Sequence, residues 1–368
     1  MNIFFKILCF SFFLFKTTVL FSEEIKIKIG VLAPLSGENA ALGKQIISSI
    51  RMALIDINDS QIEIYPKDTK SDPNIALRSA LELEKLGITL VIGPVFHKNL
   101  LHLKEIENIT FLSLTNKTLD LPKNIISSGI NSTSQLNTIK KFLKLNDIKK
   151  TIFLIPNLNY DLEIKKGIKE SKLKFFKKYD YNTDPTKLTK QIEEITKYKI
   201  RKQNLEDEIT RIKNSNEPNK EKKIKRLEKR YTIGNLNFDA VVIADFDESL
   251  KSVTTSLLYT DVKPKNKYFI TLNQWFDESL IKETDVQPIY YPSINKDNFD
   301  DYKIKYFNAF NEDPSHLSLL SYDLVGLIYY LSFKSDLTNL SKLFKKQNSF
   351  KGKIGIFDVK NNKINHRL

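Results

Sequence analysis

The sequence predicts an α/β fold in which parallel strands are covered by helices on both faces. Short apolar segments alternate with amphipathic segments along most of the 368 residues. The first apolar segment, residues 25–33, runs into a Pro-Leu-Ser-Gly turn and then an amphipathic stretch, which is the order of a βα unit. The length and the hydrophobic content of 41% indicate two or three lobes with substantial cores.

Two successive βα series predict two similar lobes, joined around residues 124–131. The first series has a predicted helix at 73–86 and strands at 25–33, 61–65, 89–94 and 109–114. A capping cluster at 131–134 then predicts a helix to about residue 145. The second series has predicted helices at 161–172 and 248–258, and strands at 151–156, 175–181, 238–244 and 268–272.

The carboxyl-terminal tail adds two predicted helices, 298–310 and 317–333, and a last strand, 353–359. The pattern alone leaves open which lobe these elements cover.

Residues 187–231 differ from the rest and predict a helical hairpin inserted into the second lobe. One apolar stripe has helical spacing up to the break at residues 214–219, and it is formed by Ile195, Tyr198, Lys202, Leu205, Ile209 and Ile212. The stripe resumes at Ile224, Leu227 and Tyr231. Residues 190–234 carry 14 Lys or Arg against 8 Asp or Glu. Two interpretations stay open, a solvated insertion or a docking arm for an acidic partner.

The first 22 residues are typical of a secretory signal peptide. A short apolar block, 7–15, follows Lys6 and is too short to span a membrane, and Ser22 offers a cleavage site. We therefore expect export to the periplasm, with an uncleaved amino-terminal anchor as the alternative. The only cysteine, Cys9, lies in the segment that is removed, so the mature chain has neither a disulfide nor a cysteine nucleophile.

Catalytic and cofactor motifs are missing from the sequence. There is no phosphate-binding glycine loop and no nucleophile elbow, and no two of the four histidines have the i,i+4 spacing of a zinc site. Asp245, Asp247 and Glu248 cluster after a predicted strand, where we interpret them as helix-capping acids rather than acid/base catalysts. We expect no enzymatic activity, no cofactor, no metal site and no nucleic-acid partner.

The remaining candidate site is the crevice at the carboxyl ends of the strands, where open parallel sheets bind ligands. Polar and aromatic side chains follow several predicted strands. The candidate cleft residues are Ser36, Asn39, Phe96, His97, Thr115, Asn116, Tyr160, Gln274 and Trp275.

A series of short motifs resembles the leucine-binding-protein family of type 1 periplasmic binding proteins. The motifs occur in the same order as in that family and span nearly all of the mature chain, at residues 29–37, 42–43, 53–58, 68–69, 91–94 and 322–323. The likeness is greatest to penicillin-binding protein activators, because of residues 39–43, the position of the charged hairpin and residues 226–240. Amino-acid carriers of the family usually have small hydroxyl residues after the third strand, where this chain has Phe96, His97 and Lys98.

The resemblance implies two Rossmann-like lobes with parallel sheets, joined by three crossovers. It assigns residues 23–130 and 293–348 to lobe 1, and residues 131–292 and 349–368 to lobe 2. It also implies a role, regulation of a cell-wall synthase (a penicillin-binding protein) by protein contact. The alternatives are a solute-binding protein that serves an ABC permease of the branched-chain amino-acid type and, more remotely, an enzyme. For partner contact we select exposed cations of the hairpin: Lys199, Arg201, Lys213, Lys222, Lys223 and Arg226.

Overall fold

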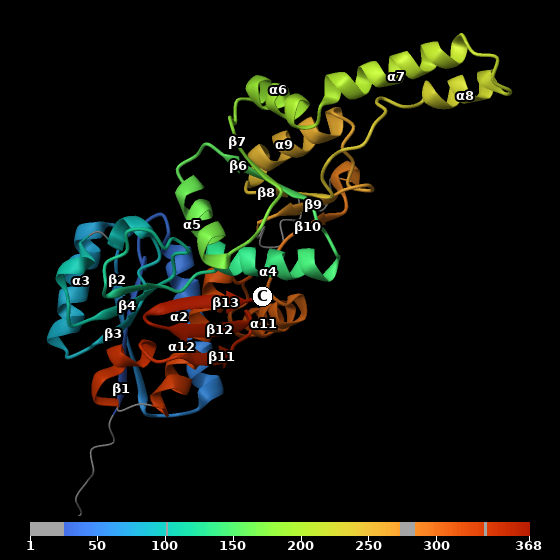
Figure 1. Cartoon of the computed structure of the whole chain (residues 1–368). Helices are drawn as coiled ribbons and strands as arrows, with labels where there is room; N and C mark the ends of the chain where they lie inside the picture. The colour runs from blue at the N-terminus through green and yellow to red at the C-terminus, as the bar shows by residue number, and fades with distance from the viewer. Residues whose placement is uncertain (1–25, 101, 273–283, 335–336) are drawn as a thin grey trace, which may run out of the picture.

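Two five-stranded parallel sheets, each flanked by helices, form two lobes (Figure 1). The computed structural model describes residues 26–100, 102–272, 284–334 and 337–368. The predicted signal peptide lies outside the described residues. Within them, no helix combines the length and apolarity needed to cross a membrane. The predicted two-lobed α/β architecture is confirmed.

The first lobe contains the sheet with strand order β2-β1-β3-β4-β5. Its strands are β1 (Ile27–Ala33), β2 (Ile62–Asp68), β3 (Leu90–Ile92), β4 (Thr110–Ser113) and β5 (Ile125–Ser127). Helices α2 (Ala40–Ile57) and α3 (Pro73–Lys85) connect the first three strands. The last strand, β5, was not predicted, and it lies where we expected the junction between the lobes, at residues 124–131.

The second lobe contains the sheet with strand order β10-β9-β8-β6-β7. Its strands are β6 (Thr151–Pro156), β7 (Lys177–Tyr181), β8 (Ala240–Ile243), β9 (Tyr268–Thr271) and β10 (Ile289–Tyr290). The helices that cover it are α4 (Ser132–Leu145), α5 (Asp161–Ser171), α6 (Pro185–Ile195) and α9 (Asp247–Tyr259). Strands β6 and β8 are buried along their whole length, as expected for strands in the middle of a covered parallel sheet.

The chain returns to the first lobe after β10. Helices α11 (Lys296–Phe310) and α12 (His316–Ser332) pack on α2. The hydroxyl of Tyr302 on α11 lies within hydrogen-bond distance of Ser49 and Ser318, at 2.7 and 3.0 Å, so the polar groups at this buried junction are satisfied.

The carboxyl terminus forms a third, antiparallel sheet of β11 (Asn348–Lys351), β12 (Ile356–Lys360) and β13 (Lys363–Arg367). We expected residues 349–368 to belong to the second lobe. Instead, Phe357, Val359 and Ile364 lie in the apolar core of the first lobe, while β13 also packs on α4. The sheet therefore lies between the lobes (Figure 1). Period-two alternation predicts such a strand but does not say which core its apolar face covers.

The inserted hairpin is shorter than predicted. Lys197 adopts a left-handed conformation (φ 53°), which ends the predicted continuous helix. Before this break, α6 packs on α9, and its residues Leu188 and Ile192 belong to the core of the second lobe. Only α7 (Tyr198–Lys213) and α8 (Lys220–Leu227) extend away from the lobe (Figure 1). We call these two helices and the turn between them the arm.

One buried carboxylate joins the third sheet to the first lobe. Asp323 on α12 is 2% exposed and accepts hydrogen bonds from the backbone N–H groups of Lys353 and Ile354, at 2.9 and 2.7 Å. Burial raises the pKa of Asp323 to about 6, although these two hydrogen bonds oppose the shift.

We predict that this carboxyl makes stability fall as the pH rises. Between about pH 4 and 6 the folded chain keeps a proton that the unfolded chain has released, so the contribution is full below pH 4 and lost above pH 6. The Asp323→Asn variant lacks this titration. Urea unfolding at pH 4 and at pH 6 gives the free energy of unfolding of both proteins. From pH 4 to pH 6, that of the native chain should fall by roughly 1–3 kcal/mol more than that of the variant. Parallel pH profiles would contradict the prediction.

Candidate functional site

The loop that follows β1 is held by the carboxylate of Asp68, at the end of β2. This carboxylate accepts hydrogen bonds from the backbone N–H groups of Leu35 and Ser36, at 2.8 and 3.3 Å, and from the Ser36 hydroxyl, at 2.5 Å. Burial alone would raise the pKa of Asp68, but these bonds and one from Lys70 outweigh it and lower the pKa. Asn39 is also engaged, because its side-chain amide donates to the Ser71 hydroxyl at 3.1 Å.

The loops after β3 and β4 carry the next four candidate residues. Phe96 packs against the core of the first lobe, and Asn116 is exposed. His97 is half-buried, and its pKa is lowered by burial and by the nearby charge of Lys117. Thr115 is buried, and its carbonyl accepts from the Ser127 hydroxyl at 2.7 Å. Two of the four, Phe96 and Thr115, thus contribute to packing.

Tyr160, the candidate on the second lobe, binds a buried carboxylate. Its hydroxyl donates to Asp245 at 2.8 Å, and the same carboxylate accepts from the hydroxyls of Tyr181 and Ser249. Asp245 is 1% exposed. Burial raises the pKa of both tyrosines, and the negative charge of Asp245 adds to the shift.

Asp245 was expected to cap the following helix. In the structure Asp245 accepts hydrogen bonds from the hydroxyls of Tyr160 and Tyr181 and from the backbone N–H of Phe246, the residue before α9. Asp247 and Glu248 lie in the first turn of α9. The tyrosines come from other parts of the chain, so helix-terminus patterns did not identify them. Gln274 and Trp275 lie outside the described residues.

A side chain that the sequence did not single out links the lobes. Glu163, in the first turn of α5, accepts three hydrogen bonds of 2.8 Å, from the backbone N–H groups of Thr118 and Leu119 and from the Thr118 hydroxyl. Lys166 of the same helix donates to the Thr118 carbonyl at 2.6 Å. We call these contacts the interlobe bridge. The only sequence signal for Glu163 is an acid in the first turn of a helix, which is also the signal of ordinary capping.

Five cavities in the described part of the chain have walls that contain no candidate cleft residue. The cavity beside the interlobe bridge has a volume of about 410 Å³. Thr118, Lys166 and the turn of the carboxyl-terminal sheet at 361–365 line it. This cavity therefore lies between the first lobe and α5 of the second lobe, next to the interlobe bridge.

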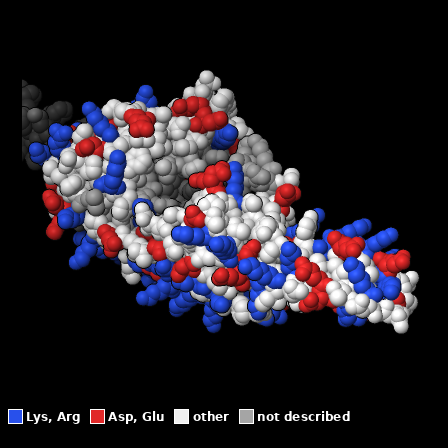
Figure 2. Space-filling view, turned by 90° about the horizontal axis from the view of Figure 1, so that it is seen from above, with Lys and Arg blue, Asp and Glu red and all other residues white. Residues whose placement is uncertain are grey.

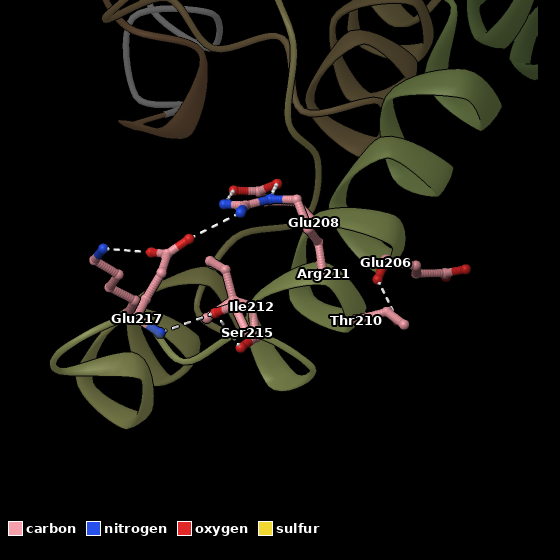
Figure 3. Close-up of polar contacts among 8 residues, drawn as sticks. Glu206, Glu208, Thr210, Arg211, Ile212, Ser215 and Glu217 are labelled. Atoms are coloured by element: carbon pink, nitrogen blue, oxygen red, sulfur yellow. Dashed lines mark hydrogen bonds and ion pairs between the residues drawn. The ribbon is translucent and has the colours of Figure 1, made fainter.

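The arm is held together by a narrow apolar seam. Leu205 and Ile212 of α7 are buried, and Ile224 and Leu227, the two apolar residues of α8, are half-buried. At the far end of the arm, Glu217 accepts from Arg211 at 2.8 Å and from Lys223 at 2.6 Å (Figure 3). Arg211 also binds Glu208, at 2.7 Å (Figure 3). These pairs fasten the turn between the helices, although each is exposed to solvent and individually weak.

The base of the arm is anchored by Arg201, which we had selected as an exposed contact cation. The structure corrects this prediction, because Arg201 is 6% exposed and donates to the Thr260 carbonyl at 3.0 Å and to the Thr232 hydroxyl at 2.6 Å. The helical stripe did not reveal this, because long cationic side chains bury their stems as readily as apolar ones.

The other selected cations differ in their partners. Lys223 pairs with Glu217, and Lys199 lies 4.0 Å from Glu193. Lys213, Lys222 and Arg226 are exposed. Residues 206–226 contain seven Lys or Arg and five Asp or Glu, and Figure 2 shows side chains of both signs along the arm. The outer arm is therefore of mixed charge rather than a continuous basic surface.

The periplasmic binding protein family model matches residues 26–198. The C-domain of LpoA from Haemophilus influenzae, a regulator of PBP1A, has a TM-score of 0.58 at 14% identity and covers 92% of this chain and 95% of that chain. An ABC transporter substrate-binding protein of Desulfitobacterium hafniense in complex with Leu has the same TM-score and identity, with coverage of 93% of this chain and 96% of that chain. The branched-chain amino-acid binding protein LivJ of Streptococcus pneumoniae, in complex with isoleucine, has a TM-score of 0.50 at 17% identity, with coverage of 92% and 97%.

These comparisons confirm the predicted resemblance at the level of fold. The chain has the fold of type 1 periplasmic binding proteins, a fold shared by amino-acid binding proteins and by a regulator of a penicillin-binding protein. An uncharacterized protein of Methanocaldococcus jannaschii is 34% identical over 87 residues, which are 22% of this chain and 21% of that protein. That match spans about a fifth of the relative's length.

We predict that the interlobe bridge limits opening of the lobes. In a Glu163→Ala variant, the donors of Thr118 and Leu119 lose their carboxylate acceptor, which should lower the free energy of unfolding by about 1–3 kcal/mol. Small-angle X-ray scattering should show a larger radius of gyration. The control is Glu194→Ala, which removes the same charge from an exposed site on α6. Identical scattering from the Glu163 variant and the native chain would show that the bridge does not hold the lobes.

Proposed function

We propose that the chain is an exported, non-enzymatic protein that regulates a cell-wall synthase of the penicillin-binding protein class through direct contact. The observation that carries this proposal is that hydrogen-bond donors in the loops between the lobes are bonded to carboxylates of the protein itself. Donors that a carrier of this fold would present to a ligand are bonded to the protein's own carboxylates, Ser36 to Asp68, Thr118 to Glu163 and Tyr160 to Asp245. Binding a free amino acid there requires these bonds to break first, which lowers affinity.

The arm supports contact with a protein. It extends from the second lobe, and its short apolar seam and the ion pairs at its end keep it folded away from the main body (Figures 1 and 3). Its exposed cations Lys213, Lys222 and Arg226 offer contacts to an acidic surface. The similarity in fold to a regulator of PBP1A gives the class of partner, by analogy.

The competing proposal is a solute-binding protein of a branched-chain amino-acid transporter. It is supported by solved structures of the same fold that contain leucine or isoleucine. The two proposals differ in what the interlobe face must do. A carrier needs free donors for a zwitterion, whereas a regulator does not.

We predict that the mature chain binds leucine and isoleucine weakly or not at all. Ser36, Thr118 and Tyr160 are already bonded to carboxylates of the protein, and specificity for a polar ligand is lost when its partners are engaged elsewhere. Isothermal titration calorimetry of the purified mature chain tests this. A dissociation constant at or below about 1 μM for either amino acid would favour the carrier over the regulator.

We predict that the arm is needed for partner binding but not for folding. Residues 206–226 are replaced by a short Gly-Ser linker, which keeps Arg201 and Leu205 at the base. The immobilised protein is then incubated with detergent-solubilised envelope extract in which penicillin-binding proteins carry a fluorescent β-lactam. Native protein should capture a labelled synthase, and the shortened protein should capture at least about tenfold less, with circular dichroism showing intact lobes.

Two charge variants separate the contribution of the arm's cations. The Lys213→Ala/Lys222→Ala/Arg226→Ala variant should weaken capture and reduce its salt dependence, because exposed charges are screened over about 8 Å at physiological ionic strength. The control, Lys44→Ala/Arg51→Ala, removes exposed cations from α2 of the first lobe. If the native protein and the variant with the linker in place of residues 206–226 capture equal amounts of the synthase, the contact surface lies on the lobes and not on the arm.

A further inference from the structure

A large polar cavity lies at the base of the arm. Its volume is about 930 Å³, which is within the range of small-molecule sites. Three segments that are distant in sequence form most of its wall, namely α7 at Arg201, the chain after α8 at 229–237, and the loop between α9 and β9 at 261–267. The cavity is separate from the interlobe face and contains none of the candidate cleft residues.

The charge of the cavity wall has one dominant sign. Six cationic side chains line it, Lys150, Arg201, Lys229, Arg230, Lys263 and Lys267, against a single acid, Asp261. Asp261 is already engaged, because it accepts from the Thr232 hydroxyl at 2.8 Å, pairs with Lys263 at 3.1 Å and lies 3.9 Å from the guanidinium of Arg201. Within the described residues, Lys229, Arg230 and Lys267 have no carboxylate partner.

Arg201 adds a buried donor to this wall. Two of its nitrogens are bonded, to the Thr260 carbonyl and the Thr232 hydroxyl. Its Nε–H is buried and has no acceptor among the described residues. A guanidinium with an unused donor, next to side chains of like charge, favours an oxyanion that accepts from several cations at once.

Few other groups in the cavity neutralise its charge. Lys263 and Lys267 lie over the rings of Tyr231 and Phe238, at 5.5 and 5.7 Å from the ring centroids. Lys150 donates to the side-chain oxygen of Asn237 at 2.8 Å. An aromatic face and an amide oxygen hold the ammonium groups of Lys267 and Lys150 in place without cancelling their charge, whereas Lys263 also pairs with Asp261.

From this cavity we propose a second binding site, for a small anion that carries two or more phosphate or carboxylate groups. The cationic groups converge on a concave polar space, so one anion contacts the base of α7, the chain that leaves α8 and the second lobe together. The bound anion then fixes the base of the arm to the lobe. This site does not depend on the proposed contact with a cell-wall synthase.

The test is titration of the purified mature chain by calorimetry, with pyrophosphate as the phosphate probe and citrate as the carboxylate probe. At low ionic strength, we expect a dissociation constant below about 1 mM for at least one probe, weakening as salt is added. The probe that binds more tightly identifies the preferred oxyanion. If neither binds at about 10 mM, the proposal is overturned.

Lys229→Ala/Arg230→Ala is the informative variant, because both side chains are exposed, line the cavity and are not needed for packing. It should lower the affinity at least about tenfold, since two cations that contact the anion are lost. The matched control is Lys44→Ala/Arg51→Ala, with the same residue types and charge change on the first lobe. If the cavity variant binds the probe with unchanged affinity, the two cations do not contact the anion and the proposed site is overturned. Equal weakening of binding in both variants would attribute the loss of affinity to net charge and would also overturn the site.

Discussion

The hydrogen bonds that Glu163 accepts from Thr118 and Leu119 join the two lobes directly. One carboxylate receives three donors at 2.8 Å, two of them backbone N–H groups whose positions are set by the fold. Removing a charged acceptor from donors of this kind costs about 1–3 kcal/mol, which is a large part of the stability of a domain. Because α5 and the loop after β4 belong to different lobes, this interaction constrains the crevice between them.

Carboxylates have the same role elsewhere on this face. Asp68 holds the loop after β1, and Asp245 holds Tyr160 and Tyr181. Each lies at the carboxyl end of a strand or directly after it, where parallel sheets place loops and free donors. In this fold the protein's own acids thus accept hydrogen bonds from donors in the loops between the two lobes.

The arm and the carboxyl-terminal sheet show how segments outside the two sheets are attached. The arm depends on its base, where Arg201 bonds to Thr260 and Thr232 and the Tyr198 ring lies 5.4 Å from the ring of Tyr259. The carboxyl-terminal sheet depends on Asp323 and on apolar residues shared with the first lobe. In both cases one buried side chain, Arg201 or Asp323, forms hydrogen bonds between the added segment and a lobe. These directional bonds fix the alignment more closely than apolar packing alone.

The sequence by itself determined most strands and helices of both lobes, although not the short strands β5 and β10. A period of two or 3.6 residues reflects burial within one element, and a segment of two or three residues is too short to show it. Strand β6 was predicted with its observed bounds, and α4, α5 and α12 within one residue at each end. It also determined the candidate loops, since the chain order of strands and helices fixes which loops meet at one edge of a parallel sheet.

Only the tertiary structure decided which side chains in those loops bind each other. Glu163 and Thr118 are 45 residues apart, and Tyr160 and Asp245 are 85 apart, so no local period connects them. Arg201 had the spacing of an exposed helix face, yet its guanidinium is buried by residues 31 and 59 positions away. Local patterns report the face on which a residue lies, whereas hydrogen-bond partners depend on where distant segments meet once both lobes have formed.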